Sequence, residues 1–225
     1  MSFQAGLPAC GLSLRAALRG GFFVWVKHFV RTMRTTLLLV FGLLGLAGCT
    51  TPPATLPDAS AWHPVGLPGK RATSYRAEHK EGRAAIRAEA QASASLWRRQ
   101  LEVAPERLRG VRWSWWVDAA IPDADLTDAD RSDSPARIVF AFDGDRQRLP
   151  QRTRMMFDLA KALTGEEPPY ATLMYVWSAD LPVGTIVRSQ RSDRIRKIVV
   201  DSGPGTLNRW RDHERDLVAD FERAF

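Results

Sequence analysis

The stretch VRWSWWV at residues 111–117 decides the fold of this chain. Its apolar residues at every second position are Val111, Trp113, Trp115 and Val117. Successive side chains of a β-strand point to opposite faces, so this spacing predicts a strand with one apolar face. Tryptophan and valine also favour strands, because they pack well on a pleated surface.

Similar short segments occur on both sides of this stretch. Residues 73–78 and 84–89 flank a tight turn at Glu81, Gly82 and Arg83, which predicts a hairpin. Further segments rich in aromatic and β-branched residues are 137–142, 172–177, 184–187 and 194–200. Short strands separated by Gly, Pro and Asp clusters predict a mainly β fold, specifically an antiparallel two-sheet β-sandwich that is jelly-roll-like.

Two segments have helical rather than strand spacing. In residues 151–163, which end before Gly165, the spaced apolar residues are Met155, Met156, Leu159 and Leu163. In residues 207–225 they are Leu207, Trp210, Leu217, Phe221 and Phe225. These patterns predict one helix inserted between strands and one near the C-terminus. Residues 96–101 are ambiguous.

The composition is that of a folded chain, since 45% of the residues are hydrophobic and 25% are charged. It excludes a wholly disordered protein, and 2 cysteines exclude a disulfide scaffold. The formal charge of +7 is distributed unevenly. Residues 1–48 hold five basic residues and no acidic one, whereas the rest of the chain holds 27 basic and 25 acidic residues. This near balance argues against nucleic acid as a partner.

The segment from Met33 to Gly48 has the three parts of a secretory signal: a basic start, an apolar run and small residues at its end. The run is shorter than the roughly 20 apolar residues that span a bilayer. Its end, LAGC at residues 46–49, resembles the lipobox of bacterial lipoproteins. The resemblance implies cleavage before Cys49, lipidation of Cys49 and, because Thr50 is not Asp, an outer-membrane anchor facing the periplasm. An uncleaved anchor or a chance cysteine is the alternative.

This signal divides the chain into four parts. Because a complete signal starts at Met33, we interpret residues 1–32 as an extension upstream of the true translation start, and residues 33–48 as the signal peptide. Residues 49–61 are rich in Pro and Thr, which is typical of a tether. Residues 62–225 are expected to form a single β-rich domain.

Five motifs of that domain occur in a recognisable order. They are RWSWWV at 112–117, SDSPARIVFAF at 132–142, LMYVW at 173–177, RKIVVDSG at 196–203 and WRDHERDLVADF at 210–221. They resemble an uncharacterised bacterial envelope family, the domain-of-unknown-function family numbered 3047. The resemblance implies an exported β-rich domain and no assigned activity. It also implies a further strand after the last helix, so a chain that stops at Phe225 is interpreted as truncated, with one open strand edge.

Catalytic motifs are scarce after residue 48. The histidines there are His63, His79 and His213, without a G-x-S-x-G elbow or zinc-ligand spacing. The expected lipid on Cys49 excludes a cysteine nucleophile. A glycosidase needs two facing carboxylates, and the sequence selects no pair. We therefore expect a protein that is not an enzyme, with a carboxylate-dependent glycoside hydrolase as an alternative.

An acidic segment follows the tryptophan-rich stretch. Its carboxylates include Asp123, Asp125, Asp128 and Asp130, which are close enough in sequence to supply several oxygen ligands to calcium. The pattern lacks the glycine and the terminal glutamate of the familiar calcium loop. The default interpretation is a solvated acidic loop, calcium is the alternative, and no other cofactor is expected.

Aromatic side chains are the candidate ligand-binding residues. Trp113 and Trp115 share one strand face, Trp116 points to the other, and Tyr175 and Trp177 share a face of a later strand. A flat ring exposed on a β-sandwich suits stacking against a sugar. The alternative is that the rings fill the space between the sheets.

Basic residues are concentrated in residues 188–197. A solvated hairpin is the default interpretation, and contact with anionic lipid head groups or phosphorylated glycans is the alternative. Together these features predict a membrane-anchored envelope lipoprotein that binds a cell-envelope glycan or another polysaccharide. The alternative is a structural or assembly lipoprotein that acts through protein partners.

Overall fold

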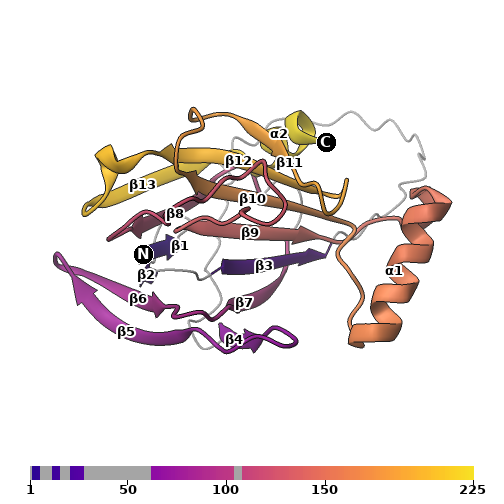
Figure 1. Ribbon diagram of the computed structural model, residues 1–225, viewed down its shortest axis with the longest axis horizontal. Coiled ribbons are helices and arrows are strands. Elements are labelled where there is room, and N and C mark those ends of the chain that lie inside the picture. The colour runs from indigo at the N-terminus through magenta and orange to yellow at the C-terminus, as the bar shows by residue number, and fades with distance from the viewer. Residues whose placement is uncertain (1, 6–11, 16–20, 28–61, 104–107) are drawn as a thin grey trace, which may run out of the picture.

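The computed structural model describes residues 2–5, 12–15, 21–27, 62–103 and 108–225 (Figure 1). The N-terminal strands are β1 (Ser2–Ala5), β2 (Leu12–Arg15) and β3 (Gly21–Lys27). The strands that follow are β4 (His63–Gly66), β5 (Ser74–Lys80), β6 (Arg83–Glu89), β7 (Ser95–Glu102), β8 (Val111–Trp116), β9 (Arg137–Phe142), β10 (Ala171–Ser178), β11 (Ile186–Arg188), β12 (Ile195–Ser202) and β13 (Trp210–Arg215). The α-helices are α1 (Gln151–Thr164) and α2 (Leu217–Ala224).

The largest sheet has seven strands in the order β11-β12-β10-β9-β3-β7-β4. β13 pairs with β8, β5 with β6, and β1 with β2 in separate antiparallel ladders. Rings of β8 stack on rings of β10, for example Trp113 on Tyr175 with centroids 4.9 Å apart, so the β8–β13 ladder covers one face of the large sheet. The prediction of a mainly β, sandwich-like fold with two helices is confirmed.

The large sheet is mixed rather than purely antiparallel. β10 pairs antiparallel with β9 but parallel with β12, and β3 runs parallel to both β9 and β7. The parallel pair arises because the chain reverses twice after β10: β11 runs antiparallel to β12 along its outer edge. β12 therefore returns in the direction of β10.

The strand and turn predictions agree closely with these elements. The 137–142 segment is β9 without change, and the ambiguous 96–101 segment lies inside β7. The predicted hairpin is β5–β6, and its turn places Glu81 at φ 49° and Gly82 at φ 74°. Glycine tolerates that left-handed backbone conformation, which is why the tight turn forms there.

The core lies between the large sheet and the β8–β13 ladder. Its largest fully buried side chains include Trp113, Trp115, Trp177, Tyr175, Ile138 and Leu173. The side chains of β10 alternate between the two faces of the sheet. Leu173, Tyr175 and Trp177 face this core. Met174 and Val176 pack in a second, smaller cluster on the opposite face.

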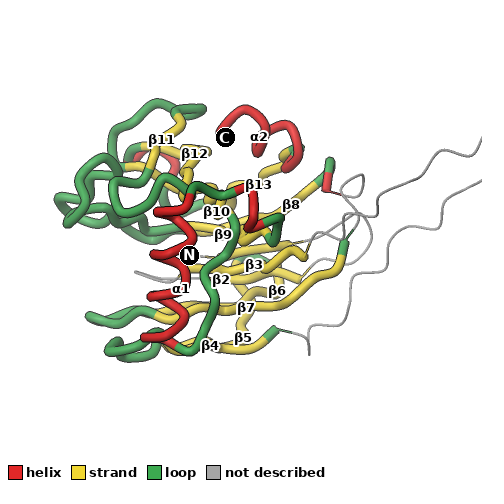
Figure 2. Tube along the Cα trace, turned by 90° about the vertical axis from the view of Figure 1, so that its right-hand side faces the viewer, coloured by secondary structure: helices red, strands yellow, loops and turns green. Residues whose placement is uncertain are grey.

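The first helix forms as predicted but does not bury its apolar residues. α1 covers Gln151–Thr164, and Gly165 ends it in the left-handed conformation at φ 74°. Figures 1 and 2 show α1 at one end of the molecule, across the ends of the strands rather than within the sandwich. Met155, Met156, Leu159 and Leu163 remain exposed.

The second helix is shorter than its predicted segment, 207–225. Trp210–Arg215 forms β13, which pairs with β8 over six residues, so a helix that includes Trp210 was wrong. Asp216 then caps α2 by accepting a hydrogen bond from the backbone N–H of Ala219 at 3.0 Å. Residues 210–215 form a strand despite their helical spacing, because they pair with the tryptophan-rich strand β8 and complete the ladder that covers the core.

Two predicted segments lie outside the described residues. They are the signal peptide, 33–48, and the tether, 49–61, which includes Cys49. β3, in contrast, falls within residues 1–32 and lies between β9 and β7 in the large sheet.

Candidate cationic pocket

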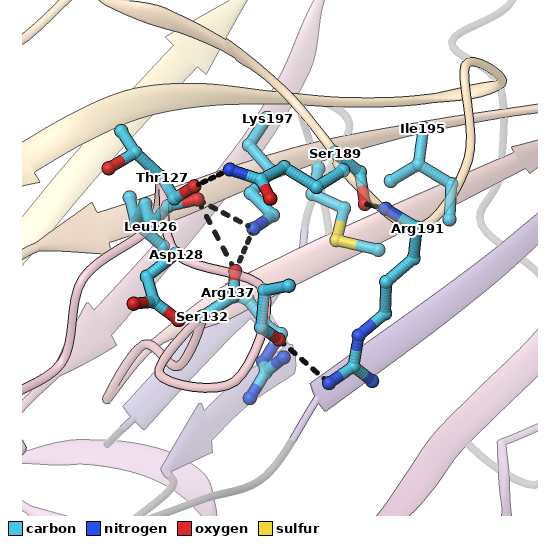
Figure 3. A pocket seen from close by; sticks show the side chains of 12 residues that line it. Leu126, Thr127, Asp128, Ser132, Arg137, Ser189, Arg191, Ile195 and Lys197 are labelled. Carbon is cyan, nitrogen blue, oxygen red and sulfur yellow. Dashed lines mark hydrogen bonds between the residues drawn. The ribbon is translucent and has the colours of Figure 1, made fainter.

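A pocket opens on the face of the large sheet that is turned away from the main core (Figure 3). One wall is the acidic loop (residues 118–136, between β8 and β9), and the other is the basic loop (residues 189–194, between β11 and β12). Its volume is about 170 Å³. The lining residues are Leu126, Thr127, Asp128, Ala129, Ser132, Arg137, Met174, Ser189, Gln190, Arg191, Ile195 and Lys197.

Strand alternation brings the floor of this pocket together. Met174 of β10 lies opposite Lys197 of β12, and Val176 lies opposite Arg137 of β9. Because Leu173 and Tyr175 face the main core, Met174 and its neighbours Lys197 and Arg137 point to the other face. Three consecutive strands of the sheet thus contribute to one site.

Lys197 is the central cation of the pocket. It is only 8% exposed, and its Nζ donates to the carbonyl oxygen of Leu126 at 3.2 Å and to Ser132 Oγ. Burial lowers the pKa of Lys197, and the positive charges of Arg137 and Arg191 lower it further. Within the described residues Lys197 forms no ion pair: its hydrogen bonds go to neutral oxygen atoms, and the carboxylates of Asp125 and Asp133, which raise its pKa, act without direct contact.

Arg137 and Arg191, the two arginines that line the pocket, have different hydrogen-bond partners. Arg137 Nη2 donates to Asp133 Oδ1 at 2.6 Å, while its Nε is buried without a hydrogen-bond partner among the described residues. Arg191 Nη2 donates to the carbonyl oxygen of Ala129 at 2.7 Å and has no carboxylate partner in the described part of the chain. Buried polar atoms are nearly always paired in proteins. An Arg137 Nε atom without a hydrogen-bond partner, close to the cations Lys197 and Arg191, therefore favours an anion in the pocket.

The two loops are joined to each other across the mouth of the pocket. Gln190 Nε2 donates to the carbonyl oxygen of Thr127 at 2.5 Å, next to the bond between Arg191 and Ala129. Residues 188–197, whose default interpretation was a solvated hairpin, therefore contact the acidic loop directly. These contacts fix the basic side chains above β12.

The acidic loop is organised by its own backbone. Asp125 accepts from Thr127 N at 2.8 Å, and Asp128 accepts from Asp130 N at 2.8 Å. The hydroxyl and the backbone N–H of Thr127 lower the pKa of Asp125, and the backbone N–H groups of Asp130 and Arg131 lower the pKa of Asp128. The Arg131 side chain contacts both carboxylates. Asp123 and Asp130 are exposed, and no group of three or more His, Cys, Asp or Glu side chains converges as a metal site within the described ranges. Of the four candidate calcium ligands, Asp125 and Asp128 thus accept turn hydrogen bonds and pair with Arg131, while Asp123 and Asp130 face solvent.

The predicted aromatic binding residues lie in the core. Trp113, Trp115, Tyr175 and Trp177 are at most 2% exposed, and Trp116 is 8% exposed. Lys80 Nζ covers Trp116 at 4.5 Å from the ring centroid, and Trp210 contacts the same ring edge-on. A sugar could not stack on Trp113, Trp115, Tyr175 or Trp177 without opening the fold, because these four rings fill the space between the sheets. Trp116 lies on the opposite face of β8, where Lys80 and Trp210 contact its ring.

Polar groups that the sequence did not single out hold the aromatic core in place. Asp201 accepts hydrogen bonds from Trp115 Nε1 at 2.7 Å, His213 Nε2 at 2.9 Å and Arg211 Nε at 2.9 Å. Burial alone would raise the pKa of Asp201, but these donors outweigh it and lower that pKa. With this network closed, His213 is a core residue rather than part of a solvated helix face.

A second carboxylate is held in the same way at α2. Asp220 accepts from Tyr175 Oη and from both Nε and Nη2 of Arg215, each at 2.7 Å. Burial opposes the ionised form, yet the bonds from Arg215 and Tyr175 lower the pKa of Asp220. Both networks lie on the core side of the sheet, so they stabilise the fold and do not contribute to the pocket.

The sequence placed Arg191 and Lys197 in a basic segment, but it did not predict that they form a pocket with Ser132 and Arg137. Lys197 shares a strand face with Ile195 and Val199, and a lysine in line with apolar side chains signals a buried cation. Ser132 and Arg137 carry no such signal. Their place depends on where the acidic loop folds back over the sheet.

The family model described as "Protein of unknown function (DUF3047)" matches residues 60–225. The chain belongs to this family. The description of the family names no activity, and no curated protein and no solved structure matches the chain. Neither helix of the described residues combines the length and the apolar character needed to cross a membrane. The pocket chemistry is therefore the basis for a functional proposal.

Proposed function

We propose that this DUF3047 protein is an envelope lipoprotein, anchored through lipidated Cys49, whose β-rich domain binds an anionic group of a cell-envelope glycan. The bound group is a phosphate or a carboxylate on a sugar. The proposal has two parts, the anchor and the pocket, which are supported separately.

The lipobox-like LAGC sequence and the Pro/Thr-rich tether support the anchor. Two or more acyl chains give stable membrane attachment, because each buried methylene contributes about 0.8 kcal/mol. Metabolic labelling with an alkyne-tagged fatty acid should mark the wild-type protein and leave the Cys49→Ala variant unmarked. Absence of label on the wild-type protein would remove the anchor from the proposal.

The unpaired charge of Lys197 is the observation that carries the pocket proposal. A buried ammonium group without a counter-ion is costly, and an anion would offset that cost while also bonding to Arg137 and Arg191. Asp128 is the one carboxylate among the lining residues, and it already binds Arg131. The net charge of the pocket is therefore positive.

The size of the pocket sets the scale of the ligand. Sites for drug-sized molecules usually have volumes of about 300–1,000 Å³. A volume of about 170 Å³ accommodates one charged substituent or one sugar residue rather than an oligosaccharide. The rest of a glycan chain would lie outside the mouth, beside the exposed residues Thr127 and Gln190.

The test is a binding comparison between matched sugars. Titration of the purified protein with glucose 6-phosphate, glucuronic acid and glucose should show heat of binding for the two anionic sugars only. Loss of a charge-assisted hydrogen bond costs about 1.5–3 kcal/mol, so Lys197→Met should weaken binding about tenfold or more. Lys70→Met is the matched control, because Lys70 is exposed and away from the pocket lining.

Three results would contradict the pocket assignment. They are equal binding of glucose, unchanged affinity in Lys197→Met, and an equal loss of affinity in Lys70→Met. A glycoside hydrolase needs two facing carboxylates, and this pocket offers only Asp128 within the described residues. Release of reducing sugar from an envelope glycan, abolished by Asp128→Asn, would replace binding by hydrolysis.

A further inference from the structure

Helix α1 presents a continuous apolar stripe to solvent. The stripe is Met155, Met156, Leu159 and Leu163, whose exposed fractions are 63%, 58%, 53% and 77%. These positions are three or four residues apart along the helix, or adjacent, so the side chains form one patch. Four large apolar side chains that are mostly exposed on one helix mark a surface that binds something.

The other side of α1 attaches it to the domain, so the stripe has a fixed direction. Thr153, Phe157 and Ala160 are the half-buried residues of the helix. Arg146 lies over the ring of Phe157, 5.4 Å from its centroid, and also pairs with Glu167 at 2.9 Å beyond the helix end. Arg146 thereby links the middle of the helix to the segment that follows it, and the half-buried residues lie on a different side of the helix from the stripe.

Helix α1 itself carries a net positive charge, while Glu166 and Glu167 follow it directly and Glu167 pairs with Lys161. α1 contains three basic residues, Arg152, Arg154 and Lys161, and one acidic residue, Asp158. Arg152 precedes Met155 and Met156 by three and four positions, so its guanidinium lies at the edge of the stripe. Arg148, just before the helix, has a side chain that is 82% exposed. Methionine and leucine bordered by arginine is the composition of helices that lie in a membrane interface.

The expected membrane anchor enters the domain beside this helix. A groove of about 380 Å³ is lined on one side by Val65 and Gly66 of β4 and on the other by Ala160 and Thr164 of α1. β4 starts at His63, directly after the predicted tether. Thirteen residues from Cys49 to Ala61 span at most about 45 Å when fully extended. The predicted tether thus joins the domain next to the groove that borders α1, and a lipid on Cys49 would lie within about 45 Å of that point.

We propose that the apolar stripe of α1 binds the surface of the membrane that carries the lipid anchor, with Met155, Leu159 and Leu163 among the acyl chains and Arg152 at anionic head groups. The inference rests on the lipoprotein part of the proposed function and is independent of the pocket. The tether confines α1 near the bilayer, so a weak interfacial contact suffices. Docking would hold the domain in one orientation on the membrane.

The experiment measures how deeply α1 lies in the bilayer. The lipidated protein carrying Leu159→Cys is labelled with a fluorophore and reconstituted into phosphatidylcholine vesicles with or without phosphatidylglycerol, containing brominated lipid as a quencher. Val183→Cys, at a loop position that is 63% exposed, is the matched control. Cleavage before Cys49 removes Cys10 and lipidation blocks Cys49, so each variant carries one label.

Quenching at position 159 in vesicles with phosphatidylglycerol, and its absence at position 183, is the expected result. Each basic residue near an anionic surface contributes about a fivefold change in the docked fraction, so Arg152→Gln should reduce quenching accordingly, as should added salt. Vesicles that float with the protein but leave the 159 label unquenched would overturn the inference. A disulfide between two Leu159→Cys copies would overturn it in favour of a dimer. Protein that does not float with vesicles would overturn the anchor, and this inference with it.

Discussion

Lys197 on β12 donates a hydrogen bond to the carbonyl oxygen of Leu126, which lies 71 residues earlier in the chain. The bond joins the acidic loop to the large sheet, and it is made by a charged group that is almost fully buried. The same ammonium therefore shapes the pocket and supplies its central charge. This dual role makes Lys197 the most informative residue to change.

We expect the stability of the ligand-free protein to rise with pH in the alkaline range. The pKa of Lys197 is lowered in the folded state, so the unfolded chain binds its proton more tightly. Stability therefore rises as pH increases from the lowered pKa towards the ordinary lysine value. Lys197→Met should remove this rise, whereas Lys70→Met should keep it. Chemical unfolding curves from pH 7 to pH 10 measure the effect, and identical slopes in all three proteins would contradict it.

Glucose 6-phosphate should stabilise the wild-type protein most at neutral pH and less at alkaline pH. An anion favours the charged form of Lys197, which is lost as pH rises through its pKa. Thermal unfolding with and without the sugar phosphate measures the difference. A stabilisation that is independent of pH, or one that persists in Lys197→Met, would assign the binding to another part of the protein.

Removal of the carboxylate at position 220 should destabilise the fold strongly. Asp220→Asn leaves the charge of Arg215 without its partner, and breaking a buried pair costs roughly 3–5 kcal/mol, with the lower end expected because Arg215 is one third exposed. Asp212→Asn is the control: its carboxylate is 63% exposed in its pair with Arg83, so a loss of about 1 kcal/mol or less is expected. Urea unfolding compares them. Equal losses in the two variants would contradict the buried network.

Acid should unfold the protein by protonating Asp201 and Asp220. The pKa values of both groups are lowered in the folded state, so their stabilisation is complete above the ordinary pKa of aspartate and is lost as pH falls through the lowered values. Circular dichroism from pH 6 to pH 2 should show the transition in this acidic window. In Asp220→Asn one of the two contributions is absent, and the dependence should become shallower. An unchanged acid profile would indicate that other carboxylates dominate.

Cleavage before Cys49 should expose the two strands that β3 joins. β3 is bonded to β9 and β7 over six and seven residues, and it precedes the predicted cleavage site. Amide hydrogens of β9 and β7 on the β3 side should exchange faster in the lipidated, cleaved protein than in an uncleaved Cys49→Ala chain expressed from Met1, which keeps β3. Hydrogen exchange with mass spectrometry resolves these peptides. Equal protection would mean that another strand or a closure of the sheet replaces β3.

Local sequence predicted most strands and one helix correctly because their signals are local. The alternation of residues 111–117 and the aliphatic run of 137–142 require only neighbouring residues to define a strand. Local prediction fails at Trp210. Its spacing to Leu217 is that of a helix, but Trp210 pairs with Trp116 of β8, about 100 positions earlier in the chain. Such a pairing has no local signature.

The tertiary structure decided which face of each strand or helix is buried and which is exposed. The sequence placed Trp113 and Trp115 together on one face, and the packing of β8 on β10 decided that this face is core rather than ligand surface. It placed Leu159 and Leu163 on one helical stripe, and the position of α1 at the end of the sheet decided that the stripe is exposed.

The sequence by itself determined the family, the predicted lipobox, the strand pattern and the acidic and basic segments, because each of these depends on residues that are close together in the chain. The tertiary structure alone decided that Ser132, Arg137 and Lys197 meet in one pocket. They come from a loop and two strands, and β10 separates those strands in the sheet. The physical reason is that hydrogen-bonded strands are neighbours in space whatever their distance along the chain, so a site built across a sheet becomes visible only when the strand order is known.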